Sequence, residues 1–137
     1  MRIRPKVGLT RTSIIAAAVG AATLMVTAVP AESAPLRNRC IQGGPSMMGG
    51  EGCFESYGDV FNADDWVSNG RRIVVKWETD YGDRGTCHDA GGEAGPGNYC
   101  NANLRESGRV RIQVVERNGA EGPDYYPGPW SSWWSID

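Results

Sequence analysis

Four cysteines have the clearest chemistry in this chain, because a thiol can form a disulfide, bind a metal or attack a substrate. Cys40 and Cys53 enclose twelve residues, as do Cys87 and Cys100, and both segments are rich in glycine. Four cysteines allow three pairings. Equal spacing and the freedom of glycine to turn favour Cys40–Cys53 with Cys87–Cys100. The chain lacks the close Cys-x-x-Cys or His-x-x-x-His pair that is typical of a structural zinc site, so we expect no metal.

His88 is the single imidazole of the chain and is followed by Asp89. Together they offer an acid and a base, so a small secreted hydrolase using His88 is one alternative. No Gly-x-Ser-x-Gly turn presents a serine, and we expect the pair to lie exposed in a loop. Further carboxylates that could cleave glycosides or hold calcium lie in predicted turns, where aspartate is favoured for local backbone bonding: Asp59, Asp64, Asp65, Asp80 and Asp83. We therefore expect neither catalysis nor a cofactor.

The last residues of the chain carry the strongest sign of binding. Tyr125, Tyr126 and three tryptophans fall within ten residues. Alternation predicts that Trp130 and Trp134 are buried and that Trp133 faces outward. Exposed indole and phenol rings stack on sugars and anchor protein interfaces, which makes Tyr125, Tyr126 and Trp133 candidate ligand-binding residues for a polysaccharide or the cell wall. The alternative is that these rings fill the core of a domain poor in Leu and Phe.

Met47 and Met48 lie between the first two cysteines. A disulfide-closed loop that presents them is a second alternative, a secreted protease inhibitor. Inhibitor loops bind tightly because they are rigid, whereas the five glycines around these methionines predict a loose loop.

The elements that position these residues follow a signal for export. A basic head precedes an apolar run from Ile14 to Val29, and small residues at Val29 and Ala31 predict cleavage after Ala31, with Ala34 as the alternative site. The rest is a mobile polar lead over 32–39 and one domain over 40–137. It would carry 10 basic and 16 acidic residues, a net charge of −6. We expect such an acidic chain not to bind nucleic acid. After removal of the signal, we also expect no stable insertion into a membrane.

Two segments alternate with the period of a half-buried strand. In the first, Ile73, Val75 and Trp77 share a face, and in the second, Val110, Ile112 and Val114 do so. Residues 62–65 read as a turn, and Asn118-Gly119 as a tight turn. No stretch after Ala31 resembles a capped amphipathic helix. The sequence therefore predicts an all-β domain, a small disulfide-stapled antiparallel sandwich or meander after a cleaved signal peptide.

The motifs Ser56-Tyr57-Gly58-Asp59-Val60-Phe61, Val75-Lys76-Trp77, Gly85-Thr86-Cys87 and Cys100-Asn101 resemble those of small uncharacterised secreted proteins of actinobacteria. That resemblance implies secretion and a compact β domain, and it implies no mechanism. The segments 110–119 and 128–131 are similar to the last two strands of fibronectin type III and immunoglobulin-like modules. Only 32 residues separate Trp77 from Val110, which leaves little room for a seven-strand sandwich.

These features together predict a secreted, non-catalytic binding or structural module. Its extracellular partner is not identified by the sequence. A polysaccharide or the cell wall, bound through the exposed aromatic rings, is the leading specific version.

Overall fold

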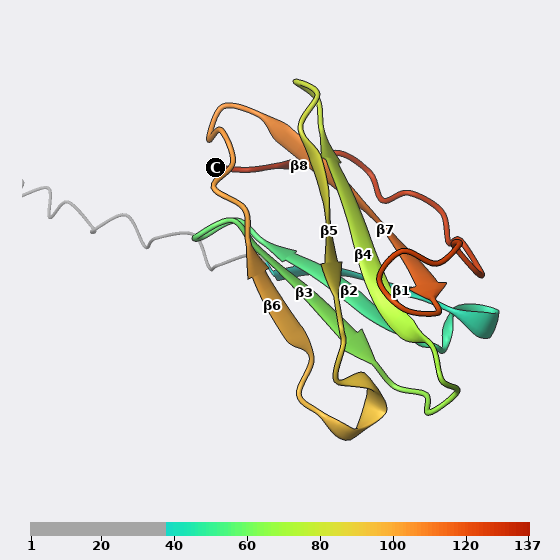
Figure 1. The fold of residues 1–137 in the computed structure, drawn as a ribbon. Helices are drawn as coiled ribbons and strands as arrows, with labels where there is room; N and C mark the ends of the chain where they lie inside the picture. Colours follow the sequence, from blue (N-terminus) through green and yellow to red (C-terminus); the bar gives the residue numbers. More distant parts are fainter. Residues whose placement is uncertain (1–37) are drawn as a thin grey trace, which may run out of the picture. The chain divides into compact units, whose positions relative to one another are not determined.

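The computed structural model describes residues 38–137, so the predicted signal peptide and most of the predicted lead lie outside the described part of the chain. Described residues form two antiparallel four-stranded sheets (Figure 1), which confirms the all-β prediction. One sheet, here sheet A, has the order β1-β2-β3-β6, and the other, sheet B, has the order β5-β4-β7-β8. The strands are β1 (Asn38–Gly43), β2 (Gly50–Glu55), β3 (Val60–Asp65), β4 (Arg72–Thr79), β5 (Arg84–His88), β6 (Asn98–Asn101), β7 (Arg109–Arg117) and β8 (Trp134–Ser135).

β4 and β7 form the centre of sheet B, where they pair from Arg72 opposite Arg117 to Thr79 opposite Val110. The predicted alternation is confirmed. Ile73 and Val75 of β4 and three apolar residues of β7 are fully buried and belong to the core cluster, namely Val110, Ile112 and Val114. β-branched residues suit this position because they pack well on a pleated, half-buried surface.

Sheet A closes the core from the other side with Phe54, Phe61 and Ala63, all fully buried. The ring of Phe61 stacks on the ring of Trp77 from sheet B, with 5.1 Å between the centroids and 6° between the planes. Apolar side chains of both sheets thus form one cluster rather than two.

The first glycine-rich segment is a hairpin and not a loose loop, which corrects the prediction. β1 and β2 pair over six residues from Asn38 opposite Glu55 to Gly43 opposite Gly50, joined by a single turn of 3-10 helix, η1 (Pro45–Met47). A Cβ on Gly52 would lie 2.5 Å from Val75 Cγ2 and 2.7 Å from Val114 Cγ2. These glycines therefore let the hairpin approach sheet B closely.

Both disulfides have the favoured pairing, although they join different parts of the fold. Cys40 lies directly opposite Cys53 in the β1–β2 hairpin, so that bond links two neighbouring strands of sheet A. Cys87 of β5 is fully buried in the core and bonds to Cys100 of β6. The second bond therefore crosses from sheet B to sheet A.

Residues 62–65 belong to β3 and not to a turn, so that prediction was wrong. Aspartate favours turns locally, but here long-range pairing with β2 and β6 decides the conformation. The expected shortage of room was also wrong. The glycine-rich segments supply four strands, since β5 and β6 flank the second one, and only residues 89–97 between them form a loop.

The last part of the chain runs along the free edge of β7. Tyr125 pairs with Glu116, the N–H groups of Gly128 and Ser131 donate to Val114 and Ile112, and Trp134 pairs with Val110. Trp134 packs against the core, as predicted. Trp130 does not, because its ring lies under the Arg111 guanidinium at 4.9 Å on the outer side of sheet B. The last segment advances three residues, from Gly128 to Ser131 to Trp134, for every two residues of β7. Its side chains therefore do not alternate between the two faces as a regular strand would.

Candidate functional site

One end of the sandwich is organised around the side chain of Glu116, which is only 1% exposed. Its carboxylate accepts hydrogen bonds from Asn69 Nδ2 at 3.3 and 3.4 Å and lies 3.5 Å from the Arg71 guanidinium. The turn of the β1–β2 hairpin closes over it, since a Cβ on Gly49 would lie 2.8 Å from Glu116 Oε1. A buried carboxylate needs such partners to offset its desolvation. Glu116 therefore fixes three chain segments together.

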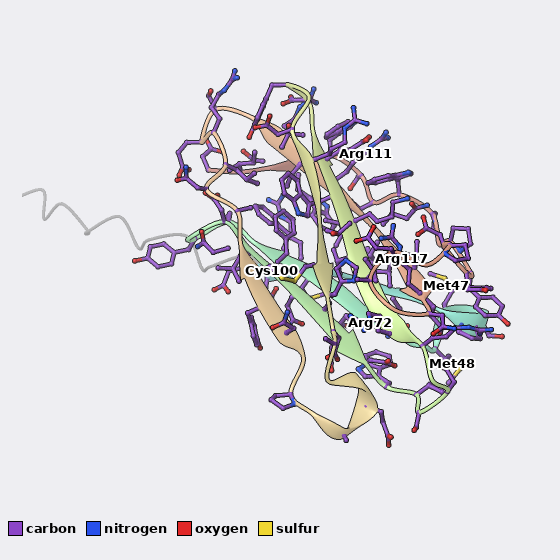
Figure 2. The ribbon with its side chains drawn as sticks, in the orientation of Figure 1. Met47, Met48, Arg72, Cys100, Arg111 and Arg117 are labelled. Carbon is purple, nitrogen blue, oxygen red and sulfur yellow. A yellow bond between two sulfur atoms is a disulfide. The ribbon has the colours of Figure 1, made fainter. Side chains whose placement is uncertain are left out.

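Exposed apolar side chains gather on the hairpin turn, on the β3–β4 connection and on the last loop, whose Tyr125 pairs with Glu116. Nine large apolar residues are exposed in the described part of the chain, and six of them lie at this end. Met47 and Met48 come from the hairpin turn, and Figures 1 and 2 show that turn beside the end of β7 and the last loop of the chain. We call the six residues the end patch: Met47, Met48, Trp66, Val67, Tyr125 and Tyr126.

Backbone bonds and ring stacking hold the end patch in place. The Trp66 N–H donates to the Gly49 carbonyl at 3.0 Å, which ties the β3–β4 connection to the hairpin. The Arg71 guanidinium lies 4.4 Å from the ring centre of Tyr125 and 5.6 Å from that of Tyr126. A cation over an aromatic face stabilises both partners.

Trp133 lies apart from the two tyrosines with which the sequence grouped it. It is near the β8 pairing at Val110, whereas Tyr125 pairs with Glu116, so about six β7 residues, roughly 20 Å, separate them. Trp133 instead borders a hollow of about 370 Å³ with polar walls that include Glu78, Asp80 and Arg109. Hydrogen bonds from the Arg109 backbone N–H and guanidinium hold the pKa of Asp80 below its usual value.

His88 and Asp89 do not face one another. His88 lies on the outer side of sheet B, where its Nε2 is 3.0 Å from Thr86 Oγ1. Asp89 is 1% exposed, and its carboxylate accepts the backbone N–H groups of Asp65 at 2.9 Å and Gly91 at 3.1 Å. The structure thus gives Asp89 a role in fixing loops, and it does not bring the two groups together as an acid–base pair.

Other carboxylates of interest also bind backbone. The Asp59 carboxylate accepts the Leu104 N–H at 2.7 Å, and that of Asp65 accepts the Val67 N–H at 3.0 Å. Burial raises the pKa of Asp65; the Val67 bond opposes this rise, and the nearby charges of Asp89 and Glu116 add to it. Within residues 38–137, one group of three potential metal-ligand atoms lies within 4.8 Å of one another, from Cys40, Glu51 and Cys53. Both of its sulfurs are already joined in a disulfide.

The hairpin turn that carries the methionines has a defined shape. Ser46 and Met47 have φ angles of 54° and 59°, in the left-handed region. A protease cleft binds a segment in extended form by adding it as a strand. The backbone of the turn is therefore curled where the inhibitor hypothesis needs it extended.

Comparisons of the chain with protein families, with curated proteins and with solved structures found no match. No helix among the described residues is long and apolar enough to cross a membrane. The fold and the site therefore define the class by themselves: a disulfide-bonded two-sheet β-sandwich with an exposed apolar patch at one end.

Sequence reasoning missed half of the residues that build this site. Trp66 and Val67 were not considered, and Arg71 and Glu116 were not singled out. A signal was available for the first two. Two large apolar residues stand between Asp64-Asp65 and Ser68-Asn69-Gly70, and turn-forming flanks of this kind indicate an exposed loop. Apolar residues in such a loop suggest an interaction surface.

Proposed function

We propose that this chain is an exported, non-catalytic binding module that holds a partner protein on the end patch. The observation that carries the proposal is the gathering of six of the nine exposed large apolar side chains on three converging segments. Soluble monomers rarely expose such a concentration unless it is used for binding. Met, Tyr and Trp are also the side chains enriched at protein interfaces.

The side-chain types favour a protein over a sugar as the partner. Methionine is flexible and polarisable and adapts to irregular apolar surfaces, whereas Met and Val offer no flat ring on which a sugar can stack. Arg71 already lies over both tyrosine rings. Cation–π contacts of this kind keep the rings oriented for an interface while leaving their hydroxyl ends free.

Export is supported by the order of charge and hydropathy at the start of the chain and by two disulfides that need an oxidising compartment. The resemblance to small secreted actinobacterial proteins agrees with it. Expression with the whole precursor should place the protein in the medium with Glu32 as its first residue. Retention of the intact precursor in the cell would contradict export.

Affinity capture from the extracellular fraction tests the binding function. The probe is the oxidised chain from Glu32 to Asp137, which contains every described strand and both disulfides. Met48→Ser with Tyr126→Asn removes much of the patch, and Asn is chosen because Tyr126 has a φ of 47° that asparagine tolerates. Tyr57→Ser with Tyr99→Ser is the matched control, since both tyrosines are exposed elsewhere.

The proposal predicts a saturable protein partner that the control variant retains and that the patch variant loses by at least tenfold in affinity. Near-UV circular dichroism establishes that both variants keep the native packing. A partner that both variants retain equally, or no partner at any concentration up to micromolar, would refute the end patch as the binding surface.

A second candidate function is glycan binding at Trp133. The observation that favours it is the polar-walled hollow beside this indole, because carbohydrate sites combine a ring for stacking with convergent polar groups. Pull-down with chitin, cellulose and peptidoglycan distinguishes the two functions. Retention lost in Trp133→Ala but kept in Tyr126→Asn would establish the glycan site, and no retention of the unmodified protein would exclude these three polymers as ligands.

A further inference from the structure

A row of basic side chains crosses the outer face of sheet B near the end patch. Arg72 of β4 and Arg117 of β7 are register partners, and both alternate with core residues, so they lie side by side on the outer face. His88 of β5 lies on the same face at the next outward position, because it pairs with Val74, two residues after Arg72. Figure 2 shows Arg72 and Arg117 on these neighbouring strands. We call these three residues the arginine row.

The protein's own carboxylates do not balance the arginine row. Within residues 38–137, Arg72 forms no ion pair. Arg117 is bonded to Asp124 at 2.6 Å, but Asp124 also binds Lys76 at 2.7 Å, so two cations share one carboxylate. Like charges directly opposite one another on paired strands are destabilising. An added anion would relieve this repulsion.

Space for such an anion exists beside Arg72. A hollow of about 310 Å³ is bordered by Arg72 and Asn118 and by loop glycines that include Gly91, Gly92 and Gly119. Glycine permits close approach of a ligand to the backbone. Asp89 also borders the hollow, but both of its oxygens already accept backbone N–H groups.

The pKa of the His88 imidazole depends on the positive charges of Arg72 and Arg117. Its Nδ1 is buried without a hydrogen-bond partner, while Nε2 is near Thr86. Burial lowers the pKa of His88 below its usual value, and the positive charges of Arg117 and Arg72 lower it further, with Glu121 opposing them. The other charged groups near the row are Lys76 and Asp124, together with Arg71 and Asp89, which border the hollow.

We propose that the arginine row binds an oxyanion, that is, a carboxylate, sulfate or phosphate group. The Arg72 guanidinium supplies a planar fork of N–H donors that fits two oxygens of such a group. Arg117 adds positive charge on the neighbouring strand, and the imidazole adds its own charge once an anion favours its protonation. The site is independent of the end patch, so its failure would leave the proposed function untouched.

The chain has a single histidine, so its imidazole NMR signals report this site without ambiguity. The experiment is a pH titration of these signals in the oxidised protein, with sodium sulfate against sodium chloride at equal ionic strength. Because a bound anion favours the imidazolium, we expect sulfate to raise the His88 pKa by roughly half a unit or more. Arg72→Gln should abolish this rise. Arg84→Gln, on the same strand as His88 but at its other end, should leave it unchanged.

Two further arms distinguish the source of the anion. Sodium phosphate tests a free oxyanion, and dextran sulfate against neutral dextran tests an anion carried on a polymer. A rise with the small ions assigns the site to free oxyanions, and a rise with dextran sulfate alone assigns it to acidic polymers. The proposal is wrong if none of these anions shifts the His88 signals beyond the chloride control, or if Arg84→Gln removes the shift as completely as Arg72→Gln does.

Discussion

Gly52 illustrates how single residues determine the distance between the two sheets. Its missing side chain leaves room for Val75 and Val114, which a Cβ would approach to 2.5 and 2.7 Å. We expect Gly52→Ala to destabilise the protein by about 1–3 kcal/mol, because overpacking forces side chains and backbone to move. The free energy of unfolding in urea measures the effect.

Gly95→Ala is the matched control for Gly52→Ala. A Cβ there would have Gly92 O as its nearest neighbour at 3.8 Å, and the φ of −114° suits any residue. Its effect should stay within about 0.5 kcal/mol. Equal changes in the two variants would show that the close approach of Gly52 to sheet B does not limit stability.

His88 provides a residue-scale prediction of pH dependence. Its pKa is lowered by burial and by Arg117 and Arg72, so the folded state favours the neutral imidazole. The stability from this group is fully present above the unfolded pKa of about 6.5 and is lost as the pH falls through the lower folded pKa. The thermal midpoint in chloride, measured from pH 8 to pH 5, should therefore fall more steeply for the native protein than for His88→Gln. Parallel curves would show that His88 does not couple to folding.

At the scale of elements, the two disulfides allow a controlled comparison. Each joins cysteines 13 positions apart, so the loss of chain entropy is the same, roughly 3 kcal/mol. Cys87 belongs to the core cluster and Cys100 packs against it, whereas Cys40 is exposed and Cys53, although buried, lies outside that cluster. Replacing Cys87 and Cys100 by Ala should therefore cost about 1–2 kcal/mol more than replacing Cys40 and Cys53, because it also leaves a cavity. Urea unfolding of the two double variants tests this order, and the reverse order would contradict it.

The same elements show how far sequence reasoning extends. β4 and β7 were predictable because their inward residues are large and apolar and their outward residues are mostly polar. β1 and β2 were not, since inward glycines such as Gly43 and Gly52 remove the apolar half of the pattern. The end of the chain failed for another reason. Its conformation follows from hydrogen bonds to β7, which no local pattern encodes.

The candidate site, too, was predictable only in part. Tyr125, Tyr126 and Trp133 were selected correctly as exposed rings, at 37%, 50% and 36% exposure. Their separation into two places was not predictable, because it depends on where each ring falls along β7. Glu116 was also hidden, since a glutamate in an alternating strand is ordinarily a solvent-facing residue, and here it is buried by segments distant in sequence.

At the scale of the described domain, contacts between the two sheets indicate that the domain unfolds as one cooperative unit. Phe61 of sheet A stacks on Trp77 of sheet B, the Cys87–Cys100 bond links the sheets, and even Ile136, next to the last residue, is fully buried. Loss of either sheet would expose the apolar face of the other. We therefore expect all-or-none unfolding, as is usual for a single domain of this size.

The test compares two probes during urea unfolding of the oxidised chain from Glu32 to Asp137. Tryptophan fluorescence reports on the five tryptophans of the chain, among them Trp77, which stacks between the sheets. Far-UV circular dichroism follows the strands of both sheets. Cooperative unfolding predicts coincident transitions with one midpoint and one slope. Trp133→Phe is the control, because it removes an exposed indole and should leave the fluorescence midpoint unchanged within error. Transitions that separate would mean that one sheet unfolds first, and the stacking of Phe61 on Trp77 would then be too weak to couple the sheets.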